Sequence, residues 1–211
     1  MYYKYPRTPH LPWSPGATSD DKIRSDLSPF EKKTVVVSLK MDGECTTMYP
    51  DYVHARSINS ADHPSRHFVK GLHSQVKWVI PEGLRICGEN MFAKHSIHYT
   101  DLEAYFLVYS IWNKTHCLGW YATEYWAKRV ELTLVPVIWV GEWSYKHDMQ
   151  KMLTELFEPY ADTHEGYVVR TYDGFKAEDF GLYVAKYVRK GHVQTDEHWL
   201  NQPIVKNLLK S

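Results

Sequence analysis

A lysine at the end of an apolar run is the residue whose type and place point most directly to chemistry. Residues 35–39 read Val-Val-Val-Ser-Leu, and Lys40 follows them, with Asp42 and Gly43 just beyond. A lysine amine has a pKa of about 10.4 and is a poor nucleophile until burial or neighbouring charges favour its neutral form. A buried strand followed by a tight glycine turn provides such a position. From these residues alone, Lys40 is either a reactive amine or an ordinary charge at a strand end.

Further charged and aromatic residues follow Lys40 in the order typical of one superfamily. Residues 40–43 read Lys-Met-Asp-Gly and resemble motif I of the covalent nucleotidyltransferases, which comprise ATP-dependent DNA and RNA ligases and capping enzymes. The later matches, in chain order, are Arg56, Glu89, and residues 106–111, 165–170 and 185–189. They resemble, in turn, the arginine that follows the nucleophile in RNA ligases, the next acidic motif, and motifs III, IV and V. Within the superfamily the chain is similar to RNA ligase 2-type proteins over roughly residues 35–199.

This resemblance implies an activity and catalytic roles. Ligases of the superfamily form a lysine-adenylate from ATP, pass AMP to a 5′-phosphate, and seal when a 3′-hydroxyl displaces AMP. Lys40 would attack the α-phosphorus, and Lys186 with Mg²⁺ or Mn²⁺ would stabilise charge on the phosphate oxygens. Glu165 would hold the metal, since hard carboxylates suit Mg²⁺. The structural alternatives are a solvated charge for Lys186 and a turn residue at a strand start for Glu165.

The resemblance also implies the nucleotide contacts. They are Leu39, Asp42, Gly43, Arg56, Glu89, Phe106, Tyr109, Glu165 and Lys186. Arg56 and Glu89 would hold the ribose and nearby phosphate groups. Tyr109 would stack on the adenine, with Phe106 as the alternative ring, and backbone groups near Leu39 would read the adenine edge. The structural alternatives are a solvated cation for Arg56, a salt-bridged or capping carboxylate for Glu89 and a core ring for Tyr109.

Motifs III and V depart from the family pattern. Motif V of RNA ligase 2 relatives carries a second lysine where this chain has Val188, so Arg189 is the candidate substitute. Motif III ends in Ser110, where many ligases have aspartate. The chain ends soon after motif V, which predicts no OB-fold domain and a polynucleotide held by the catalytic domain itself.

Basic residues for that grip lie on one expected helix, after Glu89 and in the tail. Cations on backbone phosphates supply affinity without reading sequence. The candidates are Arg66, Lys70, His73, Lys77, Lys94, His95, Arg189 and Lys190, with Trp199 in the segment 192–199 as a stacking ring. Alternatively, this segment docks on the body and closes the domain. RNA is the expected partner, while nicked duplex or DNA substrates and the oligomeric state stay open.

Two other functional classes compete with a ligase, and the twelve histidines suggest the first of them. The closely spaced pairs are His63 and His67, His95 and His98, and His192 and His198. They allow a zinc-dependent hydrolase, although none matches a recognised signature of two histidines and a carboxylate. The other alternative is a non-catalytic nucleic-acid-binding relative, against which the presence of Lys40, Glu165 and Lys186 argues. The three cysteines form no Cys-x-x-Cys pair, so they favour a reducing, cytoplasmic setting.

The apolar pattern predicts the elements that must position these residues. Expected strands cover residues 35–40, 46–49, 52–56, 84–90, 104–112, 135–140, 167–171 and 182–188. Expected helices cover 65–79, 121–132 and 145–160. Together they predict an α+β fold with curved, mostly antiparallel sheets flanked by helices. This is the nucleotidyltransferase, or adenylation, fold that the resemblance implies.

Length and composition predict one globular catalytic domain with an extended arm. The 211 residues are 44% hydrophobic and 24% charged, enough for a sizeable core. Residues 1–30 carry five prolines and predict an arm that either straps the body or meets a polynucleotide end, while 31–211 form the domain. Lys+Arg and Asp+Glu both number 25, so no overall field marks a polyanion partner. No apolar stretch approaches the roughly 20 residues of a membrane span.

Overall fold

The computed structural model describes residues 1–191 and 203–211. The strands in this part of the chain are β1 (Thr34–Lys40), β2 (Glu44–Met48), β3 (Val53–Ala55), β4 (Arg85–Asn90), β5 (Phe106–Trp112), β6 (His116–Cys117), β7 (Thr133–Leu134), β8 (Val137–Glu142), β9 (Gly166–Thr171), β10 (Phe175–Lys176) and β11 (Val184–Val188). The helices are α1 (His67–Val76), α2 (Trp120–Arg129), α3 (Met149–Phe157) and α4 (Phe180–Tyr183). Short 3₁₀ turns lie at Ser28–Phe30, Pro64–Arg66, Glu158–Tyr160 and Ala177–Asp179.

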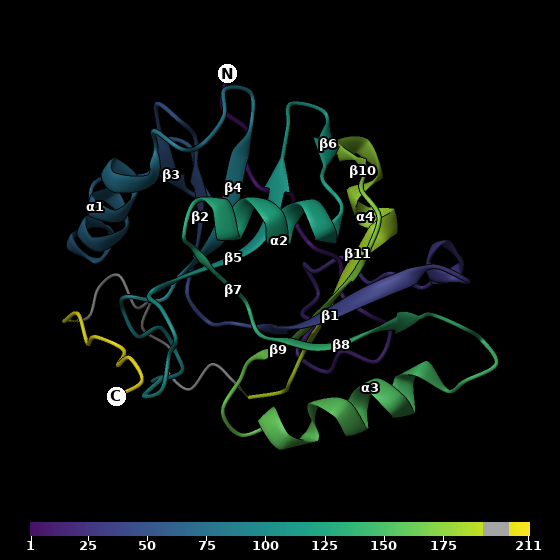
Figure 1. Ribbon diagram of the computed structural model, residues 1–211. Helices are drawn as coiled ribbons and strands as arrows, with labels where there is room; N and C mark the ends of the chain where they lie inside the picture. Colours follow the sequence, from purple (N-terminus) through teal and green to yellow (C-terminus); the bar gives the residue numbers. More distant parts are fainter. Residues whose placement is uncertain (192–202) are drawn as a thin grey trace.

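Two sheets form the body, and most of their strand pairs are antiparallel (Figure 1). One sheet has the order β11-β9-β1-β8, and the other has the order β10-β6-β5-β4-β2-β3. A short β7 pairs in parallel with β5. The prediction of an α+β fold with mostly antiparallel sheets and flanking helices is confirmed.

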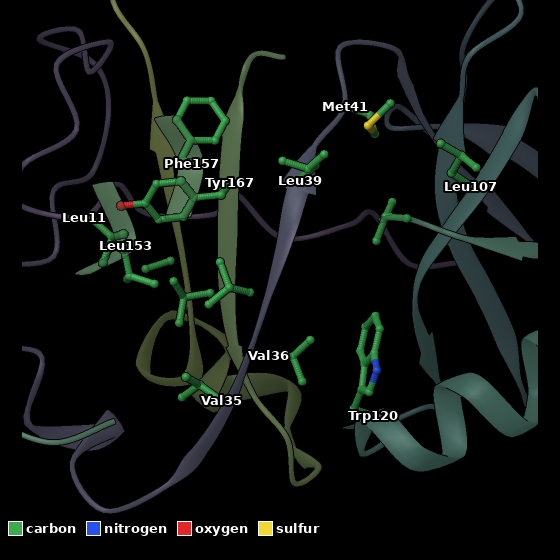
Figure 2. Packing of buried hydrophobic residues seen from close by; sticks show 14 of the residues in the cluster. Leu11, Val35, Val36, Leu39, Met41, Leu107, Trp120, Leu153, Phe157 and Tyr167 are labelled. Carbon is green, nitrogen blue, oxygen red and sulfur yellow. The ribbon is translucent and has the colours of Figure 1, made fainter. Parts of the chain in front are cut away.

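Strand β1 lies at the centre of the core, which explains its unbroken apolar sequence. The valines at 35–37 have no exposed surface, so the strand is covered on both faces. Figure 2 shows Phe157 and Tyr167 on one side of β1 and Leu107 and Trp120 on the other. Burying each large apolar side chain stabilises the fold by about 1.5–3 kcal/mol. The packing therefore fixes where Lys40 leaves the strand.

Several elements differ in extent from the prediction. The helix expected over 145–160 begins at Met149, because the Asp148 carboxylate caps it by accepting the Lys151 backbone N–H at 2.9 Å. Pro136 separates β7 from β8, where one strand over 135–140 was expected. The two-residue strands β6 and β10 were not predicted, because so short a pairing leaves no periodic signal.

The N-terminal arm packs on the body and extends one sheet. The Lys186 backbone N–H donates to the Pro9 carbonyl at 2.9 Å, and the Leu11 N–H donates to the Lys186 carbonyl at 2.8 Å. Leu11 is buried, and the Trp13 indole N–H donates to the Tyr167 hydroxyl at 2.9 Å. These contacts cover the open edge of β11.

The C-terminal residues 203–211 pack against the loop between β4 and β5. Asn207 is fully buried there, and Leu102 forms a bridge with Leu209. Within the described ranges, none of the helices has the length and apolar character needed to cross a bilayer.

Candidate functional site

A pocket of about 570 Å³ opens beside the end of β1. Its volume lies in the usual range for small-molecule sites, about 300–1,000 Å³. Lys40, Arg56, Glu89, Tyr109 and Lys186 all line it. The structure thus gathers around one hollow five of the residues that the sequence selected from distant segments.

Lys40, the last residue of β1, is held by an ion pair with Glu165. Its Nζ lies 2.5 Å from Glu165 Oε2, and the two side chains are 24% and 10% exposed. The pairing of β1 with β9 places Lys40 opposite Gly166, next to Glu165. Burial acts to lower the pKa of Lys40, but the charges of Glu165 and Glu89 outweigh it, and the pKa lies above its ordinary value. The free protein therefore holds Lys40 as an oriented ammonium.

Asp42 and Gly43 form the turn that follows Lys40. The Asp42 carboxylate accepts the backbone N–H groups of Ser96 and Ile97, both at 2.8 Å, so it anchors the turn to the neighbouring loop. Asp42 is absent from the pocket lining, while Gly43 is part of it. A Cβ at Gly43 would lie 2.6 Å from a backbone carbonyl and 2.9 Å from Glu89 Cγ. The turn therefore requires glycine because the chain passes so close to Glu89.

Glu89 stands beside Lys40 as a second carboxylate. The Gly43 backbone N–H donates to its Oε1 at 3.3 Å. Burial raises the pKa of Glu89 to about 8, with the charge of Glu165 adding to the effect and the nearby Lys40 opposing it. A cation arriving here would favour the ionised form.

The carboxylates also decide how a divalent metal would fit. No cluster of three or more metal-ligating side chains occurs among residues 1–191 and 203–211. A metal beside Glu165 and Glu89 would therefore need phosphate oxygens and water to complete its shell. Mg²⁺ characteristically takes one or two carboxylates and keeps several waters, so the donor set fits.

The lining of the pocket also includes apolar and aromatic side chains, among them one of the two predicted rings. Tyr109 lines it, with its hydroxyl donating to Cys45 Sγ at 3.0 Å and the Tyr5 ring edge-on at 5.1 Å. Phe106 lies elsewhere: it is 1% exposed in a separate core cluster, with its ring against Gly88. The structure therefore places Phe106 outside the pocket.

Leu39 lines the pocket, but its backbone donor is already used. The Leu39 N–H donates to the Pro136 carbonyl at 2.8 Å. This N–H is therefore engaged within the protein, and the expectation that backbone groups near Leu39 read the adenine edge stays a prediction.

The cations expected on the helix face are engaged within the protein. The Arg66 guanidinium forms a salt bridge with the Glu44 carboxylate, in which Nε lies 2.8 Å from Oε2. Lys70 pairs with Asp62 at 2.5 Å. His73 is buried, with Nε2 2.7 Å from the Tyr49 carbonyl, and the Lys77 ammonium lies 4.5 Å from the Trp78 ring centre. Arg66 and His73 are thus held within the protein, whereas Lys70 and Lys77 have partners at the surface, and phosphate binding by these two lysines stays a prediction.

The remaining cations lie in several places. Lys94 and Arg189 line a second pocket, of about 590 Å³, and the Arg189 Nε–H donates to the His164 carbonyl at 2.8 Å. Arg189 is therefore not beside Lys186 as a second motif V cation. Lys190 is exposed, and His95 lines the pocket with Lys40. The segment 192–199, with His192, His198 and Trp199, lies outside the described residues.

The histidine alternative has no support in the described part of the chain. His63 Nδ1 contacts the Ser65 hydroxyl at 2.7 Å, His67 Nε2 lies 3.7 Å from Asp62, and His98 contacts a backbone carbonyl. Among the described residues, these histidines do not join other histidine, cysteine or carboxylate side chains in a group of three that could hold a metal ion.

Residues of the arm line the pocket, which was not predicted. Tyr5, Arg7 and Asp21 all contribute to its wall. Their only signal in the sequence is the abundance of aromatic and charged residues in the arm, since no motif links them to Lys186.

Solved structures share this fold. They include an archaeal ATP-dependent RNA ligase, with a TM-score of 0.59 and 13% identity over 89% of this chain and 48% of that one. A mutant of Naegleria gruberi RNA ligase with ATP and Mn has a TM-score of 0.53 and 15% identity over 80% and 53%. The same ligase with PPi has a TM-score of 0.53 and 18% identity over 80% and 53%. This chain thus spans about half the length of these proteins, and the likeness is one of fold.

The family is decided by sequence. No curated protein matches the chain. The family model described as RNA ligase, however, matches residues 33–188, most of the chain. This range runs from the start of β1 to the end of β11 and contains Lys40, Glu89, Glu165 and Lys186. The chain belongs to the RNA ligase family.

Proposed function

We propose that this protein is an ATP-dependent RNA ligase that joins 5′-phosphate and 3′-hydroxyl ends through an adenylate on Lys40. The observation that carries the proposal is the Lys40 amine, paired with Glu165 at 2.5 Å at the edge of a nucleotide-sized pocket that Glu89 and Lys186 also line. Membership of the RNA ligase family supports RNA as the substrate.

In the first step, Lys40 Nζ attacks the α-phosphorus of ATP. The N–P bond forms as the bond from that phosphorus to the bridging oxygen of the β-phosphate breaks, and pyrophosphate leaves. Lys40 must first lose the proton that its raised pKa retains. It would pass this proton to water once Glu165 Oε2, its hydrogen-bond partner in the free protein, is engaged by the metal ion. Lys186 donates to the phosphate oxygens as charge develops on them.

Glu165, with Glu89 beside it, would hold Mg²⁺ or Mn²⁺ in this complex. The ion supplies charge neutralisation on the triphosphate oxygens. The Naegleria ligase structure with ATP and Mn supports this choice of cofactors. Tyr109 and Arg56 both line the pocket. In this proposal Tyr109 would stack on the base, and Arg56 would contact the ribose and phosphates.

Two transfers complete the reaction. An oxygen of the RNA 5′-phosphate attacks the adenylate phosphorus, and the N–P bond to Lys40 breaks. The 3′-hydroxyl then attacks the 5′-phosphorus, loses its proton and displaces AMP. The protein contributes alignment and charge neutralisation, because these transfers need little further covalent help.

Incubation with α-labelled ATP and Mg²⁺ or Mn²⁺ tests the proposal. The wild type should retain label after denaturation, and Lys40→Ala should retain none. Lys128→Ala is the matched control, since Lys128 is an exposed lysine on α2. Label that survives in Lys40→Ala would remove the nucleophile assignment. No label together with retained RNA would favour a binding module, and no label together with bound zinc would favour a hydrolase.

Glu165→Gln separates chemistry from folding. The amide keeps the size of the side chain but loses the charge that holds Lys40 and the metal, so labelling should fall with little change in melting temperature. An unfolded variant would instead mean that Glu165 is structural.

A further inference from the structure

The arm holds Lys186 through both its backbone and its side chain. The peptide groups of Lys186 are bonded to Pro9 and Leu11, as the extra strand pairing beside β11 requires. The Lys186 ammonium lies 3.9 Å from Asp21 Oδ1, and both side chains are 19% exposed. Asp21 is thus the arm's carboxylate at the pocket wall.

The Asp21 carboxylate is itself fixed in orientation. Its Oδ2 accepts the Thr18 backbone N–H at 3.1 Å and the Thr18 hydroxyl at 3.0 Å. This occupies one oxygen with the local turn and leaves Oδ1 on the side of Lys186.

A buried histidine stands behind Asp21. His10 is 1% exposed, and its Nδ1 lies 2.7 Å from Ser14 Oγ. Ser14 Oγ accepts the Val188 N–H at 2.9 Å, and its own proton has a nearer acceptor in His10 Nδ1 than in the Val188 carbonyl at 3.4 Å. This arrangement puts the remaining ring proton on Nε2, which faces Asp21 Oδ2 at 3.5 Å. The Nε2–H group of His10, which carries a partial positive charge, therefore faces the Asp21 carboxylate.

The pocket then contains two lysines, each with a carboxylate of its own. Lys40 has Glu165, and Lys186 has Asp21. Burial lowers the pKa of Lys186, and Lys40 and Arg56 act in the same direction, while Asp21 and then Glu165 oppose them. Without Asp21, Lys186 would be left to share Glu165 with Lys40.

We propose that Asp21 is a positioning residue that keeps Lys186 charged and turned toward the nucleotide phosphates. The inference rests on the proposed function for its place in catalysis. It assigns the arm a role in the site: the arm supplies the carboxylate that lets Lys186 act on phosphate while Glu165 stays with Lys40 and the metal. On ATP binding, the phosphate oxygens compete with Asp21 Oδ1 for the Lys186 ammonium.

Competitive acetylation of the free protein tests this without any ligase assay. Asp21→Asn keeps an oxygen for Thr18 but removes the charge facing Lys186. At a fixed mildly alkaline pH, the acetylation rate of Lys186, measured by mass spectrometry relative to Lys128, should rise roughly three- to tenfold, because loss of the opposing Asp21 charge lowers the pKa of Lys186 further and exposes more neutral amine. Asp20→Asn is the matched control, since Asp20 is the exposed neighbour, and it should leave the rate unchanged.

Equal Lys186 rates in Asp21→Asn and Asp20→Asn would overturn the proposal. A second measurement is the pH profile of adenylation, whose alkaline limb should move to lower pH in Asp21→Asn and return toward the wild type in Asp21→Glu. A uniform loss of rate with an unmoved limb would also overturn it. Should Asp21→Asn fail to fold, Asp21→Ser keeps a hydroxyl for Thr18 and carries the same test. If the wild type forms no adenylate, the proposed function fails, while the acetylation result still decides the role of Asp21.

Discussion

Asn207→Ala tests whether the C-terminal segment holds the turn that presents Lys40. The Asn207 side-chain amide donates to the Met91 carbonyl at 2.7 Å and the Ala93 carbonyl at 3.3 Å, and its oxygen accepts the Tyr99 N–H at 2.9 Å. The Tyr99 hydroxyl in turn accepts the Asp42 N–H at 3.1 Å. One buried side chain therefore connects the chain end to the turn after Lys40.

The size of the effect follows from what the substitution leaves behind. Asn207 has no exposed surface, so the Met91 carbonyl and Tyr99 N–H lose their partner where water cannot easily replace it. Each buried polar group left unpaired costs about 1–3 kcal/mol, so we expect a total near 3 kcal/mol. For a chain of this size, that lowers the melting temperature by about 6–12 °C.

Urea unfolding and the adenylation rate together check this prediction. Leu208→Ala is the control, because Leu208 is the neighbouring side chain but is 49% exposed, and surface changes usually stay within about 0.5 kcal/mol. Asn207→Ala should also adenylate more slowly at a temperature where both variants are folded, since the Asp42 turn loses its support. An unfolding free energy within about 1 kcal/mol of the wild type would refute the reasoning.

Three further predictions concern the fold, pH and metal. Gly166→Ala should prevent folding, because a Cβ there would overlap the Tyr187 carbonyl across the β9–β11 pair, while Gly181→Ala, which meets open space, should be tolerated in a thermal melt. Burial lowers the pKa of His54, so the unfolded chain binds the proton more readily below about pH 6.5 and stability should fall as the pH drops. His54→Phe should flatten that slope in urea titrations, and an unchanged slope would contradict the assignment. EDTA should abolish adenylation, leave the melting temperature unchanged and be reversed by Mg²⁺ or Mn²⁺, whereas activity that persists in EDTA would argue against a metal.

The strands and turns that carry the motifs could be predicted, because each is encoded by residues that are consecutive in the sequence. The apolar run of β1 and the glycine turn after Lys40 follow from consecutive residues, and the family resemblance supplied Glu89, Glu165 and Lys186. The structure adds that Lys40, Glu89 and Lys186 line one pocket and that Glu165 holds Lys40.

What could not be predicted depends on contacts between distant segments. Phe106 and Tyr109 lie three apart on β5, so they point to opposite faces, and a strand buried on both faces gives no periodicity to show which face meets the pocket. The partner of Arg66 is Glu44, on a separate strand. Asp21 meets Lys186 only because the arm pairs with β11, and nothing near Asp21 in the sequence indicates that contact.

Mass spectrometry of the intact protein after incubation with ATP and Mg²⁺, followed by peptide mapping, tests the central claim most directly. We predict the added mass of one adenylyl group, located on Lys40. An unmodified protein under these conditions, or an adenylyl group found on another lysine such as Lys186, would contradict the account.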